Sequence, residues 1–224
     1  YTKVVELGCG LGFNTIYLAR LFPQVQFLAM DITEANIALA RKQAKDLANV
    51  RFECFDYNTH EHTYQADVIF GVETFCYAAN FGTLINNLSK ALVPGGRLVI
   101  FDGYETQPDL VNHLNHDAQI AYRLVCRGFA LERFQSLSEV HQAFQSNHLL
   151  LEHDSDHTAG ILPNYKVFQQ GCLRLLSYPR ITRLLLKLGL LPAAAFRQLP
   201  SGLFGPYFFE QGHLSYRQFI VSKA

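Results

Sequence analysis

The sequence contains no tryptophan, a single methionine and no excess of charge of either sign. Lysine and arginine together number 19, as do aspartate and glutamate, so the net charge is zero when the histidines are neutral. A balanced chain produces no net field that would attract nucleic acid, and we therefore expect no nucleic-acid partner. We find no signal-peptide pattern and no apolar run long enough to cross a bilayer.

Cysteine is also scarce, and its distribution argues against two structural uses of the residue. The chain has no Cys-x-x-Cys pair, and its five cysteines are scattered: Cys9, Cys54, Cys76, Cys126 and Cys172. This pattern is typical of reduced thiols in a cytosolic protein, rather than of a disulfide framework or a zinc site. We therefore expect a cytoplasmic protein, and its 224 residues suffice for one α/β domain with a sizeable core.

The most informative stretch lies near the start of the chain. An apolar run reaches Glu6 and Leu7, after which glycine occupies every second position, at Gly8, Gly10 and Gly12. A helical pattern begins directly after the last glycine. This order predicts a buried strand, a tight turn and a helix N-terminus, where free N–H groups can meet a nucleotide-like ligand. The alternative is a glycine-rich turn that binds nothing.

The spacing of the glycines narrows the choice of ligand. A dinucleotide fingerprint, Gly-x-Gly-x-x-Gly, would place a third glycine where the chain has Phe13, and the Gly-Lys-Ser/Thr ending of a Walker loop is absent. The remaining pattern, Glu-x-Gly-x-Gly-x-Gly, resembles that of class I S-adenosylmethionine (SAM) dependent methyltransferases. The resemblance implies SAM as the cofactor and a binding site that includes Glu6, Gly8, Cys9, Gly10 and Gly12.

A second predicted strand, residues 25–30, ends at Asp31. In a parallel sheet with right-handed crossovers, the end of this strand lies beside the end of the first. A carboxylate at that point can accept hydrogen bonds from both hydroxyls of a ribose, so we assign Asp31 and its neighbour Ile32 to the cofactor site. Alternatively Asp31 caps the helix predicted over 35–44, although Thr33 is better placed for that role.

Two more strands are predicted over 49–55 and 66–72. In the family that the chain resembles, an acidic residue after the third strand reaches the adenine amino group, and the next residue turns its N–H toward the ring. The resemblance thus implies Asp56 and Tyr57, although Asp56 could instead cap a turn. The carbonyl of Val72, which ends the fourth strand, is placed to accept from the amino group of SAM.

The polar loop between these strands contains His60-Glu61-His62. Three consecutive loop residues rarely converge on one metal ion, so a solvated loop is the better interpretation. We expect no metal site.

A second motif of the same family follows a helix predicted over 81–92. It is a Leu-x-Pro-Gly-Gly-x-Leu turn, here residues 92–98, and a strand is predicted over 97–102. The resemblance therefore covers residues 2 to about 103 and implies an α/β, Rossmann-like fold. The expected architecture is a seven-stranded, mostly parallel sheet with helices on both faces and an inserted helical cap.

The second half of the chain is less regular. Strands are predicted over 149–154 and 214–222, and helical runs with several prolines lie between them. We interpret the chain as a single domain over 1–224 with cap insertions at about 104–147 and 160–210. Such a cap would cover the strand ends, where open α/β sheets bind ligands.

The acceptor of the methyl group depends on this cap, which is rich in leucine and phenylalanine. That composition favours a small, apolar acceptor such as an isoprenoid, quinone, sterol or polyketide-like molecule, and the C-terminal part weakly resembles sterol, tocopherol and prenyl-quinone methyltransferases. Glu73, just past the fourth strand, is the first candidate base. His113 and His116 follow, three positions apart on a predicted cap helix, although each suits a structural or surface role equally well.

One predicted helix is basic and amphipathic. Within residues 180–188, Arg180, Arg183 and Lys187 share one face and aliphatic side chains occupy much of the rest. Such a helix can lie peripherally on an anionic membrane surface, or it can be an ordinary surface helix with a solvated cationic face. The sequence carries no signal for an oligomeric state.

Three other functions share parts of these patterns. An aminopropyl transferase has the same fold but would need an acidic polyamine pocket, and the region near 102–106 offers only Asp102 and Glu105. Phe13 disfavours a nicotinamide-dependent oxidoreductase. A SAM-binding sensor or scaffold without catalysis would carry the same glycine loop.

Overall fold

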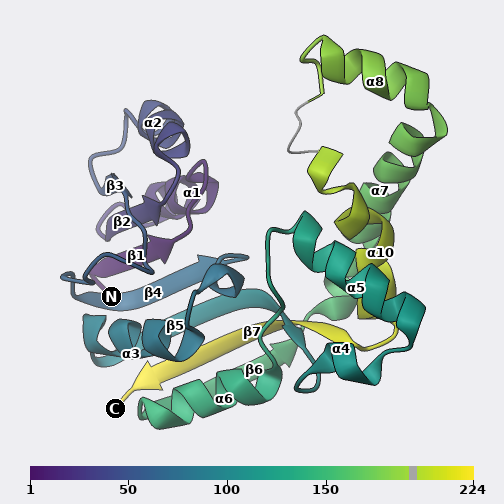
Figure 1. Cartoon of the computed structure of the whole chain (residues 1–224). Coiled ribbons are helices and arrows are strands. Elements are labelled where there is room, and N and C mark those ends of the chain that lie inside the picture. The colour runs from purple at the N-terminus through teal and green to yellow at the C-terminus, as the bar shows by residue number, and fades with distance from the viewer. Residues whose placement is uncertain (192–195) are drawn as a thin grey trace. The chain divides into compact units, whose positions relative to one another are not determined.

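Seven strands form one sheet in the order β3-β2-β1-β4-β5-β7-β6 in the computed structural model, which describes residues 1–191 and 196–224 (Figure 1). Parallel pairing joins β3, β2, β1, β4 and β5 in that order. The strands are β1 (Lys3–Leu7), β2 (Gln26–Asp31), β3 (Val50–Cys54), β4 (Ala66–Val72), β5 (Leu92–Glu105), β6 (Leu149–Asp156) and β7 (Leu214–Lys223). The predicted seven-stranded, mostly parallel α/β sheet is confirmed.

The chain divides into two compact units. The first contains residues 1–102, 139–155 and 217–224, and the second contains residues 103–138 and 156–216. The second unit thus consists of two separate stretches of the chain, whereas the sequence predicted a single domain with cap insertions at about 104–147 and 160–210. Most of α6 (Leu137–Ser146), which the prediction assigned to the cap, belongs to the first unit.

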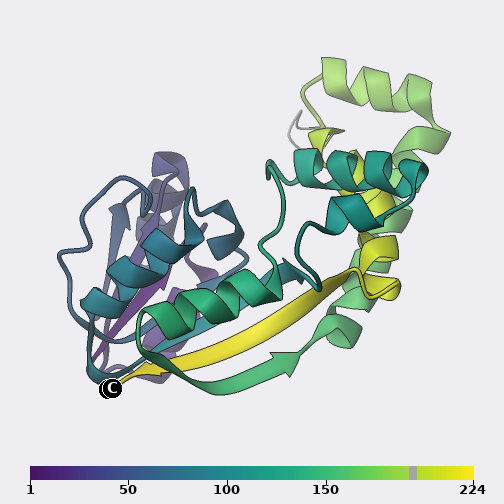
Figure 2. The ribbon, with the colours of Figure 1, turned by 60° about the horizontal axis from the view of Figure 1, so that its bottom comes forward.

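Helices cover both faces of the sheet in the first unit. Figures 1 and 2 show α1 (Phe13–Leu21) and α2 (Glu34–Gln43) on one face, and α3 (Phe81–Ala91) and α6 on the other. The sequence of α3 explains its limits and its orientation. The Asn80 side chain caps it by accepting from the Thr83 N–H over 2.8 Å, and Leu84, Ile85 and Leu88 are buried against the sheet.

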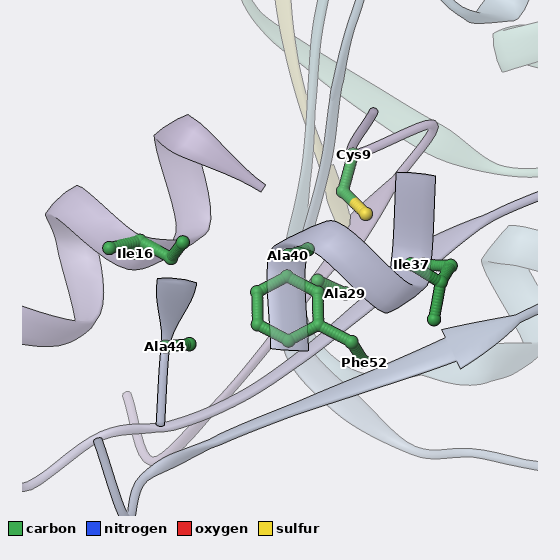
Figure 3. Close-up of a cluster of buried hydrophobic side chains, with 7 residues drawn as sticks. All are labelled: Cys9, Ile16, Ala29, Ile37, Ala40, Ala44 and Phe52. Carbon is green, nitrogen blue, oxygen red and sulfur yellow. The ribbon is translucent and has the colours of Figure 1, made fainter. Parts of the chain in front are cut away.

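A cluster of small and apolar side chains fixes the glycine loop and α1 against α2 and β3. Phe52 of β3 lies at its centre, and Figure 3 shows the other members around the ring. All seven are buried: Cys9, Ile16, Ala29, Ile37, Ala40, Ala44 and Phe52. Alanine on α2 lets the helix approach the sheet closely, and the ring of Phe52 fills the space that remains.

The Pro94-Gly95-Gly96 turn lies inside β5 rather than before it. The prediction began the fifth strand at Arg97, whereas β5 starts at Leu92 and its pairing with β4 shifts register between Ala66 and Val68. Gly95 has a φ of 73°, which makes the extra residues of β5 bulge out of the ladder. The motif therefore shapes a strand irregularity.

In the second unit, α10 (Leu199–Glu210) packs closely on α5 (His116–Gly128) and α7 (Thr158–Ser177) through small residues. The Ser201 hydroxyl donates to the Val125 carbonyl over 2.9 Å. A Cβ atom on Gly202 would lie 2.4 Å from the Cys172 sulfur, so only glycine fits there. The second unit also contains α4 (Leu110–His113) and α8 (Pro179–Lys187).

A buried carboxylate also holds the second unit together. Glu105, at the end of β5, accepts hydrogen bonds from the Tyr122 hydroxyl on α5 and, over 3.2 Å, from the Leu110 N–H at the start of α4. The Tyr122 hydroxyl in turn accepts from the Phe134 N–H over 3.3 Å. One carboxylate thus fastens two helices and a loop to the strand end.

Candidate functional site

The residues predicted to bind the cofactor come together at one edge of the first unit. They lie at or just after the carboxyl ends of β3, β2, β1 and β4, which are consecutive neighbours in the sheet. In an open α/β sheet this edge is where ligands bind. The set comprises Glu6, Gly8, Cys9, Gly10, Gly12, Asp31, Ile32, Asp56, Tyr57 and Val72.

The glycine loop between β1 and α1 is a tight turn in which all three glycines have left-handed φ angles: 66° at Gly8, 53° at Gly10 and 77° at Gly12. The Gly12 N–H donates to the Cys9 carbonyl over 2.8 Å, and the Cys9 N–H donates to the Met30 carbonyl over 2.9 Å. The loop is therefore anchored to β2 before it enters α1. Other residue types rarely adopt such angles, so the alternating glycines are required by the backbone.

Two of the glycines face very different surroundings. A Cβ atom on Gly12 would lie 2.6 Å from the Phe52 ring, so this glycine is needed for packing. A Cβ atom on Gly10 would meet no heavy atom within 4 Å. The open side of the loop is therefore at Gly10, where a ligand could approach the backbone.

Asp31 connects β2 to this open side. Its Oδ2 accepts from the Gly10 N–H over 2.8 Å, and its Oδ1 accepts from the Thr33 N–H over 2.8 Å. Thr33 occupies the N-cap position of α2 without a side-chain capping bond, so Asp31 is not the N-cap residue, although its Oδ1 also accepts from the Asn36 amide over 3.4 Å. A carboxylate has about four acceptor positions, and the half-buried Asp31 retains capacity for further donors. Its neighbour Ile32 is 65 % exposed.

Glu6 is buried, and its carboxylate is engaged by α1. The Thr15 hydroxyl donates to Oε2, and the Asn14 amide donates to Oε1 over 3.1 Å. Burial raises the pKa of Glu6 above its ordinary value, while these hydrogen bonds oppose the rise. In this geometry Glu6 holds the first turn of α1 to β1 and positions the loop, and its oxygens point to protein donors.

The loop after β3 is fastened to the loop after β4. The Tyr57 hydroxyl donates to the Thr74 carbonyl over 2.6 Å, and the Asn58 side chain accepts from the Ala79 N–H over 2.8 Å. Asp56 accepts from the Asn58 N–H over 2.9 Å and from the Thr59 hydroxyl over 3.0 Å. Asp56 therefore caps its own turn, which was the alternative interpretation, while its adenine contact stays a prediction.

The histidines of this loop pack on an aromatic residue. The His60 ring stacks on Phe55 with centroids 5.1 Å apart, and the His62 ring meets the Phe55 edge at 5.3 Å. His62 contacts the Tyr57 carbonyl, and burial lowers its pKa. Across residues 1–191 and 196–224, no group of three or more His, Cys, Asp or Glu side chains is arranged to hold a metal ion.

The end of β4 makes a sharp turn at the first candidate base. The Glu73 N–H still pairs with the Phe101 carbonyl over 2.8 Å, but its φ is 53°, which non-glycine residues rarely adopt. The turn brings Thr74 close to the glycine loop, because a Cβ atom on Gly8 would lie 2.0 Å from the Thr74 hydroxyl. Glu73 itself is exposed, one residue after Val72.

The two candidate histidines belong to the second unit. The prediction placed them on one helix, which is wrong, because His113 ends α4 and His116 begins α5. The break occurs at Asn115, whose side chain accepts from the Ala118 N–H over 2.9 Å and caps α5. Both histidines are exposed.

Several residues of the site were not found from the sequence. Thr15 and Asn14 hold Glu6, Thr74 contacts Gly8 and Tyr57, and Asn58 joins two loops. The signal that could have identified Asn14 and Thr15 is their place in the first turn of α1, directly after the glycines. Nothing local in the sequence marks Thr74 or Asn58.

Residues 5–98 match a protein-family model described as a methyltransferase domain. This part of the chain is therefore similar to methyltransferase domains. The resemblance predicted from the glycine loop and the Pro-Gly-Gly turn is confirmed for these residues, and the sheet order agrees with it.

Relatives of the methyltransferase domain are found among characterised proteins. The chain is 34 % identical over 109 residues to malonyl-[acyl-carrier protein] O-methyltransferase of Bacillus cereus. This match covers 48 % of the chain and 40 % of that protein. It is 38 % identical over 99 residues to trans-aconitate 2-methyltransferase of Variovorax paradoxus, covering 44 % of the chain and 37 % of that protein. The chain thus spans less than half the length of these curated relatives.

The fold of the whole chain resembles that of a solved methyltransferase. The crystal structure of geranyl diphosphate C-methyltransferase from Streptomyces coelicolor, in complex with Mg²⁺, geranyl diphosphate and S-adenosyl-L-homocysteine, matches with a TM-score of 0.70. The match covers 100 % of this chain and 74 % of that one at 17 % sequence identity. The likeness therefore extends beyond the methyltransferase domain.

Proposed function

We propose that this protein is a SAM-dependent methyltransferase that acts on a small, apolar acceptor. The observation that carries the proposal is the hydrogen bond between Asp31 and the Gly10 N–H on the open side of the glycine loop. It joins a carboxylate to the backbone of the loop that leads into α1, at the carboxyl edge of the sheet. Both residues lie inside the segment that matches the methyltransferase family.

The residues at this edge fit SAM. Asp31 accepts from two backbone N–H groups at 2.8 Å and, over a longer 3.4 Å, from the Asn36 amide, and in our proposal its remaining acceptor capacity serves the ribose. Gly10 presents backbone without a side chain, which lets a ligand approach closely. Ile32 offers an exposed apolar surface next to Asp31, suited to one face of a nucleoside.

When bound, SAM supplies a methyl group on a cationic sulfur, already activated for in-line displacement. The protein must therefore position donor and acceptor and exclude water. In our proposal the glycine loop and the Val72 carbonyl hold the methionine end, with Glu6 keeping the loop in place. Asp31 binds the ribose, and the turn at Asp56 and Tyr57 borders the adenine.

The proposed acceptor is isoprenoid-like, or an apolar molecule such as a quinone, sterol or polyketide. Two observations support this class. The second unit is rich in leucine and phenylalanine. The fold of the geranyl diphosphate enzyme matches 100 % of this chain. The curated relatives are named for other acceptors, trans-aconitate and a malonyl-carrier protein, and they match less than half of the chain.

An acceptor oxygen or nitrogen must lose a proton when it is methylated. We propose Glu73 as the base, because its turn follows Val72 directly at the carboxyl edge of the sheet and its side chain is exposed. His113 and His116 are the next candidates, both exposed on the second unit. A carbon acceptor would place different demands on these residues.

Two alternative functions, aminopropyl transfer and SAM binding without catalysis, can be distinguished from methyl transfer. An aminopropyl transferase needs free carboxylates for a polyamine, but Asp102 accepts from the Cys76 N–H over 2.9 Å and Glu105 from Tyr122. Both are buried. A SAM-binding sensor or scaffold would keep the cofactor site and lack transfer.

Calorimetry with SAM, S-adenosylhomocysteine and NADH tests the cofactor, and labelled SAM tests the reaction. We expect SAM and its product to bind and NADH not to bind, and we expect label to enter the lipid fraction of a cell extract. No binding of SAM or its product at sub-millimolar concentration would refute the proposal. Binding of SAM without transfer to any extract fraction would support the sensor. Glu73→Gln should lower the rate of transfer if Glu73 is the base and leave it unchanged if Glu73 takes no part.

We also propose that the protein works in the cytoplasm. All five cysteines are free, and Cys9, Cys76, Cys126 and Cys172 are buried. Free thiols in this number favour a reducing compartment. Fractionation of cells that express the protein tests this location.

A further inference from the structure

Charge is unevenly distributed along this chain, although its total is zero. Residues 157–209 contain no aspartate or glutamate at all. The same stretch contains the cations Lys166, Arg174, Arg180, Arg183, Lys187 and Arg197. Lys166 pairs with Glu210 at 3.0 Å, and the stretch as a whole still has an excess of positive charge, with α8 inside it.

The helix α8 has three distinct faces. Thr182 is buried and its hydroxyl donates to the Leu175 carbonyl of α7 over 2.6 Å, which fixes the inward face. A second face consists of aliphatic side chains that are more than half exposed: Ile181 at 55 %, Leu184 at 54 % and Leu188 at 61 %.

The third face is cationic. Arg180, Arg183 and Lys187 follow one another at helical spacing, and all three are exposed. The salt bridges found within the described part of the chain do not include any of them. An exposed aliphatic stripe beside an unpaired cationic stripe is the arrangement of an interfacial helix.

The exposed apolar surface continues beyond α8. Figures 1 and 2 show α8 following the end of α7 at the extremity of the second unit. Leu173 and Leu176 on the last turns of α7 are about half exposed, and Tyr178 at the corner is 61 % exposed. Tyrosine is enriched where protein meets the headgroup region of a bilayer.

We propose that α8 and the end of α7 form a docking surface for an anionic lipid bilayer, with the aliphatic stripe entering the headgroup region. Arg180, Arg183 and Lys187 then lie at the level of anionic headgroups, where each cation strengthens partitioning about fivefold. The attachment is peripheral. No helix among residues 1–191 and 196–224 is both long and apolar enough to span a membrane. This inference is independent of the proposed methyl transfer.

The charge pattern favours a bilayer over a second copy of the chain. In a two-fold symmetric dimer the same surface meets itself, so the cationic stripe of α8 would face another cationic stripe. Residues 157–209 offer no carboxylate that could pair with it. A bilayer containing anionic lipid supplies both the negative charge and the apolar phase.

Vesicle sedimentation measures this docking directly. The probes are vesicles of phosphatidylcholine alone and of phosphatidylcholine mixed with phosphatidylserine. We expect binding to the mixed vesicles, weak binding to the neutral ones, and a loss of binding at high salt. Arg180→Gln, Arg183→Gln and Lys187→Gln combined should lower the partition coefficient about a hundredfold.

A matched variant removes the same charge elsewhere. Lys42→Gln, Lys45→Gln and Lys90→Gln combined neutralise three exposed lysines of the first unit, and binding should remain within about twofold of wild type. A second α8 variant, Ile181→Ser with Leu184→Ser, keeps every cation and should lower partitioning by about tenfold or more. Circular dichroism and thermal unfolding confirm that each variant is folded.

The absence of tryptophan provides a spectroscopic readout of insertion. Leu184→Trp introduces a single fluorophore on the aliphatic stripe, and we expect its emission to shift to the blue and to be quenched by brominated lipid. Leu39→Trp, at a 49 % exposed position on α2, is the control and should not respond.

The outcomes are distinct. Equal binding by the α8 charge variant and the control variant would overturn the proposal. So would an unchanged Leu184→Trp spectrum with anionic vesicles. A wild-type dimer in sedimentation velocity that the serine variant converts to a monomer, without vesicle binding, would assign the same surface to self-association. Retained methyl transfer by a non-docking variant would leave the proposed function intact.

Discussion

The carboxylate of Asp31 accepts a hydrogen bond from the backbone N–H of Gly10 over 2.8 Å. This bond ties the end of β2 to the glycine loop that follows β1. It places a negative charge beside Gly10, where, unlike at Gly8 and Gly12, an added Cβ atom would meet open space. In our proposal, cofactor binding and loop geometry therefore depend on the same carboxylate.

Asp31→Ala should weaken the binding of SAM and S-adenosylhomocysteine by about 1–3 kcal/mol, because a charge-assisted bond to the ribose is left unmade. Asp31→Asn keeps one acceptor oxygen, so its affinity for SAM should lie between that of wild type and that of Asp31→Ala. Isothermal calorimetry measures both. Asp46→Ala, at an exposed residue paired with Arg20 at 3.7 Å, is the control and should bind normally. Unchanged affinity in Asp31→Ala would refute the ribose assignment.

Gly10→Ala should separate binding from stability. The added Cβ meets no atom of the protein within 4 Å, so the fold loses only the cost of a left-handed alanine, about 1–2 kcal/mol. The same atom occupies the space through which the cofactor would reach the backbone. We expect affinity for SAM to fall by about tenfold or more, measured by calorimetry on folded protein. Normal affinity would place the cofactor elsewhere.

Gly12→Ala should show the opposite pattern, a large loss of stability. Its Cβ would lie 2.6 Å from the Phe52 ring, which adds an overpacking cost to that of the φ of 77°. The sum is about 2–5 kcal/mol in urea unfolding. Gly95→Ala, with a φ of 73° and no neighbour within 4 Å, should cost only about 1–2 kcal/mol. Equal losses in the two variants would contradict the packing argument.

Glu6 makes the stability of the fold depend on pH. Burial raises its pKa in the folded state above the ordinary value of 4.5. As the pH rises above 4.5, the unfolded chain releases this proton first while the folded protein retains it, so stability falls until the folded group ionises. Glu6→Gln has no such proton, and its free energy of unfolding should lack this component.

Urea unfolding at a series of pH values compares the two proteins. The difference between wild type and Glu6→Gln should shrink or reverse as the pH rises from 4.5. Thr15→Val removes the hydroxyl that opposes the rise in the Glu6 pKa, so its loss of stability should extend to higher pH. Parallel pH profiles for all three proteins would show that Glu6 is not the titrating group.

Tyr122→Phe tests the polar centre of the second unit. The Tyr122 hydroxyl donates to the buried carboxylate of Glu105 and accepts from the Phe134 N–H. Removal of the hydroxyl should lower the free energy of unfolding by about 1–3 kcal/mol, because the buried Glu105 carboxylate and the Phe134 N–H each lose a partner. Tyr17→Phe, at a 65 % exposed tyrosine on α1, should be neutral. A neutral Tyr122→Phe would mean that other donors satisfy Glu105.

Much of the first unit could be predicted because its elements are signalled locally. The strand predicted over 66–72 has those bounds, and the helix predicted over 81–92 differs from α3 by one residue. Apolar periodicity, proline and the glycine motif carry this information without reference to distant residues. The position of Asp31 at a strand end followed in the same way, through the rule for parallel crossovers.

The predictions failed where the answer lay in contacts between distant segments. The single helix expected to carry His113 and His116 is two helices, and most of α6 belongs with the first unit. Both segments are amphipathic, and periodicity shows that a face is buried without showing what buries it.

The sequence by itself determined the sheet, the glycine loop, the carboxylate at Asp31 and, from them, the methyltransferase class. Only the tertiary structure decided which partner each polar group takes. Glu6 is held by Thr15 and Asn14, whereas Asp31 keeps acceptor capacity at the open side of the loop. The reason is physical: a carboxylate's role depends on which donors are buried with it, and burial is set by the packing of the whole unit.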